Sequence, residues 1–205
     1  MKTKPKIILT VLLGLAWAGT AVFGGYALLK YENSPGQVGQ VRSAWPADSK
    51  VQLATDRPTL VMAAHSQCPC TRAGLAELAQ LMAHVQGKVQ VYVLFYSPRD
   101  SGADWQNTDL RRSAAQIPGV MVLSDIDGEE AQRFGAETSG HTFLFDARGR
   151  LLFNGGITGS RGHSGDNAGA SSVVSLINNR RSERANSFVF GCSLKDSNKQ
   201  APCLK

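Results

Sequence analysis

Residues 58–85 read PTLVMAAHSQCPCTRAGLAELAQLMAHV, and this stretch decides the fold. The apolar run at 59–64 is typical of a buried strand, and residues 72–85 carry apolar side chains at helical spacing. The cysteine pair Cys68-Pro69-Cys70 stands where the strand ends and the helix begins. The positive end of a helix dipole stabilises a thiolate, which is the form of cysteine that attacks disulfides or binds soft metal ions. The stretch therefore predicts a reactive thiol site.

The residues in and around the cysteine pair suit that chemistry. Cys68 comes first and begins the helix, so we expect it to face solvent and to act as the nucleophile. Cys70 would then resolve the mixed disulfide. Pro69 fixes the local geometry, Arg72 adds a nearby positive charge, and His65 either tunes the thiolate or serves in capping and packing. Two inert, buried cysteines beside a turn are the alternative interpretation.

The N-terminal segment has the composition of a membrane anchor. Residues 1–6 contain three lysines, the next 23 residues (7–29) carry no charge, and Lys30 closes the run. At about 1.5 Å per residue, such a helix spans a bilayer core of about 30 Å. Ala16-Trp17-Ala18 resembles the cleavage site of a secretory signal, but the apolar run continues for eleven more residues, so we favour an uncleaved anchor. The lysines predict that residues 1–6 are cytoplasmic and that the domain is periplasmic, at a bacterial inner membrane.

Composition and charge limit the classes of function. The chain has 205 residues, 42% hydrophobic and 19% charged, which fits one globular domain with appendages. The formal net charge of +6 is modest and basic residues are scattered, so no nucleic-acid partner is predicted. All four cysteines lie outside the apolar run, and an exported domain permits disulfides.

The pattern along the chain predicts a linker, or an arm ordered over the domain, at 30–49, a domain at 50–185 and a cysteine-containing tail at 186–205. Within the domain, strands and helices alternate before a β-hairpin and a closing helix. After the opening strand and helix, the expected elements are a strand at 89–96, a helix at 105–117, a strand at 120–123, a helix at 127–134, hairpin strands at 142–145 and 151–153, and a helix at 168–184. This order predicts an α/β fold with a mixed central sheet covered by helices on both faces.

Residues 50–185 resemble the thioredoxin fold, and more narrowly the membrane-anchored redoxins of bacteria, the TlpA-like and RedB-like proteins. Residues 58–72 and 141–150 carry the resemblance. It implies a three-layer domain whose Cys68 and Cys70 exchange thiols and disulfides with exported proteins. Because no cofactor motif is present, reducing equivalents would come from an electron donor in the membrane.

The sequence departs from the family pattern at two places, and the second departure points to another function. The cysteines are spaced Cys-x-Cys instead of Cys-x-x-Cys, and His141 stands where the family has a cis-proline that shapes the substrate groove. SCO-type copper proteins share this fold and place a histidine at this strand entrance. That resemblance implies that Cys68, Cys70 and His141 bind Cu(I) in a metal-delivery protein, because two thiolates and an imidazole suit a soft ion.

Two further features lie in the C-terminal third. Glycine recurs between positions 155 and 169, and this loop would either border the cysteine site as a lid or groove wall, or be simply flexible. Cys192 and Cys203 most simply form a disulfide that pins the tail. The alternative is that Cys192 reaches Cys68 as an exchange partner.

Overall fold

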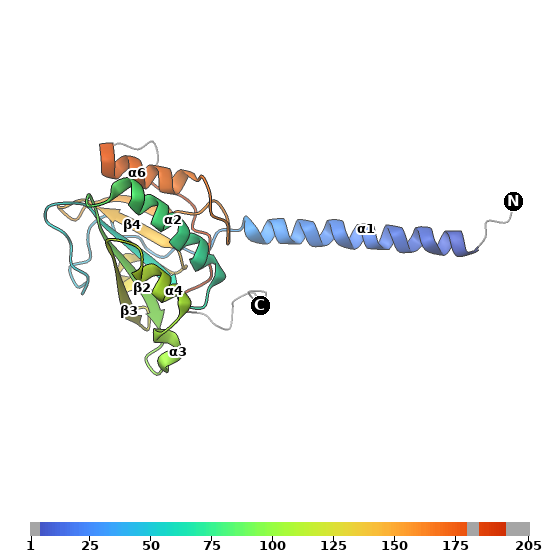
Figure 1. The fold of residues 1–205 in the computed structure, drawn as a ribbon, viewed down its shortest axis with the longest axis horizontal. Helices are drawn as coiled ribbons and strands as arrows, with labels where there is room; N and C mark the ends of the chain where they lie inside the picture. The colour runs from blue at the N-terminus through green and yellow to red at the C-terminus, as the bar shows by residue number, and fades with distance from the viewer. Residues whose placement is uncertain (1–4, 180–184, 196–205) are drawn as a thin grey trace. The chain divides into compact units, whose positions relative to one another are not determined.

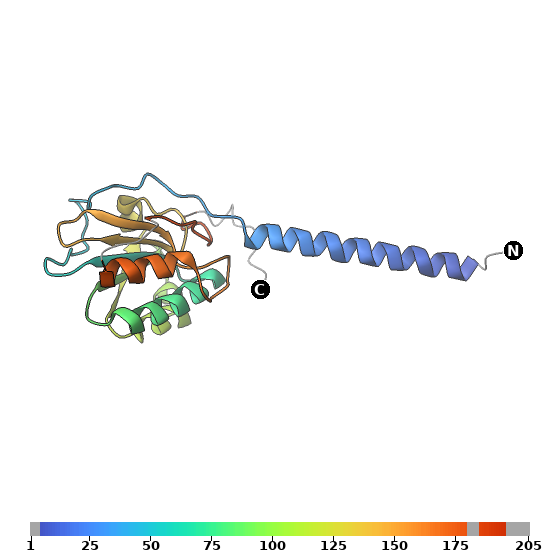
Figure 2. The ribbon, with the colours of Figure 1, turned by 90° about the horizontal axis from the view of Figure 1, so that it is seen from above.

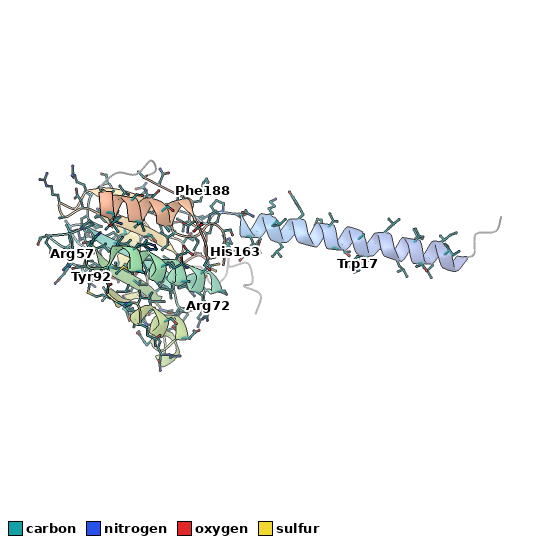
Figure 3. The ribbon with its side chains drawn as sticks, turned by 45° about the horizontal axis from the view of Figure 1, so that its top comes forward. Trp17, Arg57, Arg72, Tyr92, His163 and Phe188 are labelled. Carbon is teal, nitrogen blue, oxygen red and sulfur yellow. The ribbon has the colours of Figure 1, made fainter. Side chains whose placement is uncertain are left out.

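The computed structural model describes residues 5–179 and 185–195, and its contacts divide the chain into two units, Met1–Ser34 and Pro35–Lys205. The described part of the first unit is dominated by the helix α1, Pro5–Glu32. Its segment Ile7–Glu32 has a mean hydropathy of 2.1, and none of the most apolar 18-residue stretch in that segment is buried. Trp17, labelled in Figure 3, is 74% exposed on this helix. By length and composition, α1 is able to cross a membrane, as predicted.

The second unit is built on a five-stranded mixed sheet in the order β3-β2-β1-β4-β5 (Figure 1). The central strand β1 is parallel to β2 and antiparallel to β4, and all seven of its residues are buried. Its apolar run is continuous because it has strands on both sides and packed layers on both faces. The strands are β1 (Thr59–His65), β2 (Gln90–Ser97), β3 (Val120–Ile126), β4 (His141–Phe145) and β5 (Leu151–Gly156).

Helices cover both faces of the sheet (Figures 1 and 2). On one face, Leu78 of α2 and Val173 of α6 pack in one core with Phe95 of β2. On the other face, Phe134 of α5 packs against Phe143 of β4. This is the thioredoxin-like three-layer arrangement that the sequence predicts. The helices are α2 (Pro69–Val85), α3 (Ala103–Gln106), α4 (Asp109–Ala115), α5 (Glu129–Phe134) and α6 (Ala168–Asn179).

One expected helix is divided in two. The prediction of a single helix at 105–117 is wrong, because Thr108 is extended (φ −84°, ψ 157°) and its hydroxyl accepts a hydrogen bond from the Arg111 N–H. Thr108 therefore caps α4 and separates it from α3. Of the helix expected at 168–184, the structure describes α6 to Asn179, and residues 180–184 lie outside the described part.

The β4–β5 hairpin has the predicted turn at 146–149. The Asp146 carboxylate accepts hydrogen bonds from the backbone N–H groups of Arg148 and Arg150, both at 2.9 Å. Gly149 has φ 76°, a left-handed conformation that glycine adopts without steric cost. The turn residues thus explain why β4 reverses direction into β5 at this point.

Part of the segment predicted as a linker packs against the domain. The Gly36 N–H donates to Val189 O at 2.8 Å, and the Trp45 N–H donates to Gly149 O at 2.7 Å. The Trp45 ring lies edge-on to Phe134 and Phe145, with centroids 5.0 and 5.1 Å apart. Residues 36–50 therefore form an arm that adds aromatic surface to the core beside α5.

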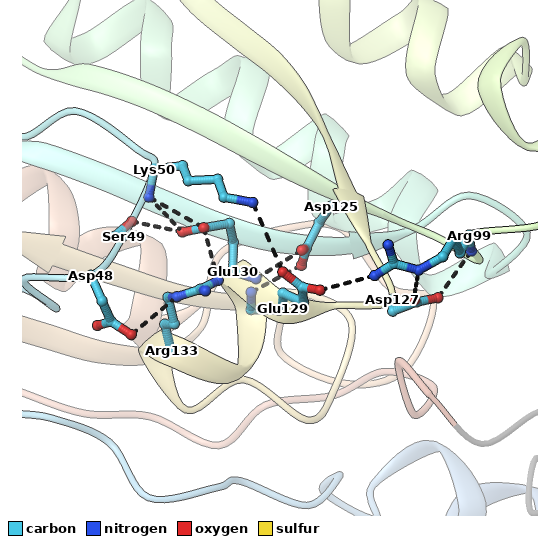
Figure 4. Close-up of polar contacts among 10 residues, drawn as sticks. Asp48, Ser49, Lys50, Arg99, Asp125, Asp127, Glu129, Glu130 and Arg133 are labelled. Atoms are coloured by element: carbon cyan, nitrogen blue, oxygen red, sulfur yellow. Dashed lines mark hydrogen bonds and ion pairs between the residues drawn. The ribbon is translucent and has the colours of Figure 1, made fainter.

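A polar network joins the end of this arm to α5 (Figure 4). The half-buried Arg133 contacts Asp48 at 3.2 Å and Glu130 at 3.0 Å. The Glu130 carboxylate also accepts a hydrogen bond from the Ser49 hydroxyl at 2.7 Å. The buried Asp125 carboxylate in turn accepts the Glu130 N–H at 2.8 Å, which fixes the start of α5 at the end of β3. The arm and α5 thus act as one layer.

Trp45→Ala should lower the free energy of unfolding of the domain by about 2–4 kcal/mol, because it removes a half-buried aromatic ring from the contacts with Phe134 and Phe145. Denaturant unfolding of the detergent-solubilised chain, followed by circular dichroism, measures the change. Trp17→Ala, the same substitution on α1, is the control and should leave domain unfolding unchanged. Equal stability of the Trp45 variant and the parent would contradict the packed-arm description.

Candidate functional site

The cysteine pair lies where β1 passes into α2. The Cys68 N–H donates to His65 O at 3.2 Å, which closes a turn directly after the strand. Cys68 is the N-cap residue of α2, with extended backbone angles, and Pro69 opens the helix at a position that needs no N–H donor. The helix therefore begins three residues earlier than the apolar spacing indicates, and both cysteines belong to its N-terminal end.

Three sulfur atoms meet at this point. The Sγ atoms of Cys68, Cys70 and Cys192 all lie within 4.8 Å of one another, and those of Cys68 and Cys192 are 2.7 Å apart. Cys68 and Cys192 are buried, and Cys70 is half-buried. The expectation that Cys68 faces solvent is wrong, because the chain around Cys192 covers it. Of the pair, Cys70 is the cysteine that a substrate sulfur can approach.

The three cysteines favour a negative charge on Cys68. Hydrogen bonds from Cys192 and then Cys70 lower the pKa of the Cys68 thiol far below its ordinary value, against the opposing effect of burial. The backbone N–H groups of Cys192 and Thr71 lower this pKa further. For Cys70, the contact with Cys192 lowers the pKa, but the contact with Cys68, burial and the Cys68 charge together raise it to about 11. The contacts thus favour the thiolate form at Cys68, the most buried of the three residues, and the thiol form at Cys70.

A C-terminal strap, residues 185–195, positions Cys192. The Ser139 N–H donates to Cys192 O at 2.8 Å, and the Leu194 N–H donates to Glu137 O at 2.9 Å. Gly191 lies so close to Ser139 that a Cβ at that position would overlap the Ser139 carbonyl oxygen. The strap is therefore held along 137–139, directly before β4, on both sides of Cys192. The predicted Cys192–Cys203 disulfide stays a prediction, because Cys203 lies outside the described residues.

Ser139 connects the three segments of the site. Its buried hydroxyl accepts the His65 N–H at 3.0 Å and lies 2.9 Å from the Thr71 hydroxyl, while its N–H binds the strap. Thr71 also donates its hydroxyl to His65 O at 3.0 Å. Sequence reasoning missed Ser139, and only its position directly before the 141–150 segment could have drawn attention to it.

The glycine-rich loop borders the cluster. The Arg161 guanidinium donates to Gly191 O of the strap, and its charge acts to lower the pKa of Cys70. The buried Glu77 of α2 holds the other end of the loop, accepting the Gly165 N–H at 2.6 Å and the Asn167 amide at 3.0 Å. This placement agrees with the groove-wall interpretation, although sequence reasoning did not single out Arg161.

Arg72 and His65 lie beside the pair in different settings. Arg72 is exposed on the first turn of α2, at the end of the domain that also carries His163, and forms an ion pair with Asp109 at 2.5 Å (Figure 3). Its charge is therefore directed at Asp109 instead of the thiols.

His65 is buried, its Nδ1 accepts the Gln67 N–H at 3.2 Å, and its ring stacks on Tyr96 at 5.8 Å. Burial lowers the pKa of His65, opposed by the Cys68 charge. Both the packing and the thiolate-tuning interpretations thus have a contact that supports them.

His141 occupies a buried site of its own at the start of β4. It is wholly buried, its ring centroid is 4.1 Å from that of Phe143, and neither ring nitrogen has a hydrogen-bond partner among the described residues. Burial lowers the pKa of His141 to about 4. In the described part of the chain, the close set of possible metal ligands contains Cys192 and not His141, so the expected Cys68, Cys70 and His141 set is not the one brought together.

Comparisons with known proteins bear on the fold. No protein-family model and no curated protein sequence matches the chain. An uncharacterized conserved protein from Geobacillus kaustophilus is similar in structure, with a TM-score of 0.57 at 18% identity over 82% of this chain and 95% of that one. A hypothetical protein from Sinorhizobium meliloti 1021 gives a TM-score of 0.56 at 18% identity over 81% of this chain and 98% of that one. A thioredoxin-like protein in its oxidized form gives 0.45 at 17% identity over 72% and 93%. The first two similarities show a shared fold alone.

His141→Leu should remove part of the acid sensitivity of the domain. In an unfolded chain the imidazole has a pKa near 6.5, against about 4 in the folded domain. Between these values only the unfolded chain binds the proton, so the free energy of unfolding falls as the pH decreases from 6.5 toward 4. His141 accounts for about 3 kcal/mol of that fall. Denaturant unfolding over this pH range measures the difference between variant and parent.

His84→Leu is the matched control, because His84 is an exposed residue of α2 whose Nδ1 contacts Gln80 O at 2.8 Å. The change in acid dependence caused by His141→Leu should exceed the change caused by His84→Leu. His141→Leu should also be at least as stable as the parent at neutral pH, because it removes two buried nitrogens that have no partner among the described residues. The same acid dependence in His141→Leu and in the parent would contradict the description of a neutral, desolvated imidazole.

Proposed function

We propose that this protein is a membrane-anchored thiol–disulfide oxidoreductase that acts on exported proteins in the periplasm. The observation that carries the proposal is the Cys68 sulfur at the start of α2, which lies against the sulfurs of Cys70 and Cys192, contacts that lower its pKa. Exchange requires a thiolate next to the sulfur atom that it attacks. When a disulfide breaks, a thiol with a low pKa is a good leaving group. The cluster meets both requirements.

The two cysteines of the pair take different parts in the exchange. Cys70 is half-buried, so a substrate sulfur reaches it first, and the mixed disulfide forms there. Cys68 is buried and charged, so it breaks or makes the bond to Cys70 from inside the domain. This order reverses the roles predicted from sequence position, in which Cys68 met the substrate.

The membrane part of the proposal rests on α1 and its flanking lysines. The helix is long and apolar enough to span a bilayer, and the three lysines in residues 1–6 favour a cytoplasmic N-terminus. The domain would then work in an oxidising compartment, and its thiols would exchange electrons with a donor held in the same membrane. Exported protein thiols and disulfides are the substrates that such a location supplies.

Delivery of Cu(I) is a second candidate function, favoured by the same sulfur cluster. Three thiolate ligands suit a soft ion, and Cys68, Cys70 and Cys192 are close enough to bind one ion together. His141, the third ligand in the SCO-type interpretation, lies outside this set. The metal-binding residues would therefore be three cysteines.

Cys68→Ser should reduce the rate at which the chain reduces a small aromatic disulfide by at least ~100-fold, because it removes the thiolate that connects the other two sulfurs. Absorbance of the released aromatic thiol measures the rate. Cys203→Ser is the control, since the proposed exchange does not use Cys203. A parent that binds one Cu(I) tightly in competition with a chelator, and does not reduce the disulfide, would favour metal delivery instead.

A reporter enzyme that folds only outside the cytoplasm should be active when fused after Lys205. The positively charged flank would keep residues 1–6 inside the cell and send the domain across the membrane. N-terminal sequencing of the purified protein should find residues 1–29 retained. A chain starting near Gly19 would contradict the anchor, and a silent reporter would contradict the periplasmic location.

A further inference from the structure

We infer that the working disulfide of this domain joins Cys68 to Cys192, and that Cys70 transfers electrons between this pair and the substrate. The inference rests on the proposed thiol–disulfide exchange and assigns the strap residue Cys192 a part in it. It differs from the usual assumption that the two neighbouring cysteines of such a motif form the disulfide.

The distance between the sulfur atoms of Cys68 and Cys192 favours a disulfide between them. The Sγ atoms of Cys68 and Cys192 are already 2.7 Å apart, and both side chains are buried. A disulfide has an S–S bond of about 2.05 Å, so it forms here with a small side-chain movement. Cys68 and Cys70, by contrast, are separated by one residue, and closing a disulfide between them forms a small, constrained ring that is easily reduced. The pair with the longer connection therefore makes the more stable disulfide.

The strap is anchored to the domain on both sides of Cys192. Hydrogen bonds run from Ser139 N–H to Cys192 O and from Leu194 N–H to Glu137 O, and Arg161 binds Gly191 O. Upstream, the Gly156 N–H donates to Phe188 O at 3.2 Å. Contacts at four positions of the strap hold the Cys192 sulfur against Cys68 without a disulfide, so an exchange between the two needs no large movement.

A substrate sulfur has access to Cys70 and not to Cys68. A substrate protein cannot touch the Cys68 sulfur, because only 1% of the residue is exposed. Cys70 is half-buried, beside Arg161 of the glycine-rich loop, and its pKa is raised, so its thiolate is scarce but strongly nucleophilic when formed. The three cysteines thus divide into an outer residue and an inner pair.

Reduction of a substrate disulfide takes three successive exchanges. The Cys70 thiolate attacks one substrate sulfur, and the other leaves as a thiolate and takes up a proton. The Cys68 thiolate then attacks the Cys70 sulfur, and the second substrate thiolate leaves. Cys192, after losing its proton, attacks the Cys68 sulfur and releases the Cys70 thiolate. Two electrons pass from Cys68 and Cys192 to the substrate, and oxidation of a substrate dithiol follows the same steps in reverse.

Disulfide mapping of the full chain tests the inference. The reduced, detergent-solubilised protein is mixed with a limiting amount of a small aromatic disulfide, quenched with acid, alkylated and digested with trypsin. Cleavage at lysine and arginine leaves Cys68 and Cys70 in residues 51–72, Cys192 in 185–195 and Cys203 in 200–205. Mass spectrometry should find 51–72 linked to 185–195.

Two variants assign the roles of the cysteines. Cys70→Ser should form the same link when treated with diamide, a small oxidant that reaches buried thiols, and should lose the reduction of the aromatic disulfide. Cys192→Ser should lose the link and accumulate a mixed disulfide or a disulfide within 51–72. Cys70→Ser keeps the inference testable if Cys192→Ser does not fold.

Three different results would overturn the inference. Parent-like turnover in Cys192→Ser, with a disulfide confined to 51–72, would overturn the inference and leave the proposed function standing. A link between 185–195 and 200–205 in place of the expected one would also overturn the inference, because it assigns Cys192 to the tail. A parent that reduces no disulfide at all would overturn the proposed function and the inference together.

Discussion

The site depends on the hydrogen bonds of one buried residue, Ser139. Its hydroxyl binds the His65 N–H at the end of β1 and contacts the Thr71 hydroxyl in the first turn of α2, while the Ser139 N–H binds the carbonyl of Cys192. The turn at 65–71, Ser139 and the strap, which are distant in sequence, are therefore fixed at one point. The buried hydroxyl and N–H of Ser139 rigidify their surroundings, because breaking any of these bonds leaves a buried polar group without a partner.

Around that point, the fold concentrates negative charge on a single sulfur. Burial alone would raise the pKa of Cys68, as it does for an isolated thiol in an apolar core. Hydrogen bonds from Cys192 and Cys70 and the N–H groups around the start of α2 have the larger, opposite effect. The domain therefore keeps a thiolate inside, next to two sulfurs with which it can exchange. His141 is equally buried, but in the described part of the chain no hydrogen bond stabilises its charged form, so burial lowers its pKa and favours the neutral imidazole.

The sequence by itself determined the architecture. The fully apolar run in 60–64 predicts a central strand, and the helical spacing after Cys-Pro-Cys predicts the helix packed on it. Alternating strands and helices followed by an Asp146–Gly149 turn predict a mixed sheet with a terminal hairpin. These features are local, since each depends on the periodicity or turn chemistry of a few consecutive residues. The capping by Thr108, which divides one predicted helix, is also local, but its signal is weaker than the apolar spacing around it.

Only the tertiary structure decided which cysteine meets which, and which one solvent reaches. Position at the start of the helix suggested that Cys68 is exposed. The SCO-type resemblance implied His141 as a third ligand, and the simplest pairing of the remaining cysteines placed Cys192 in a tail disulfide. The strap reverses the first expectation and alters the second, because it returns along residues 137–139 and inserts Cys192 over Cys68. Its path is set by backbone hydrogen bonds and by the close contact at Gly191, and such long-range contacts have no periodicity that a sequence can display. The sequence determines which reactive groups are present, and the packing of distant segments determines how they are combined.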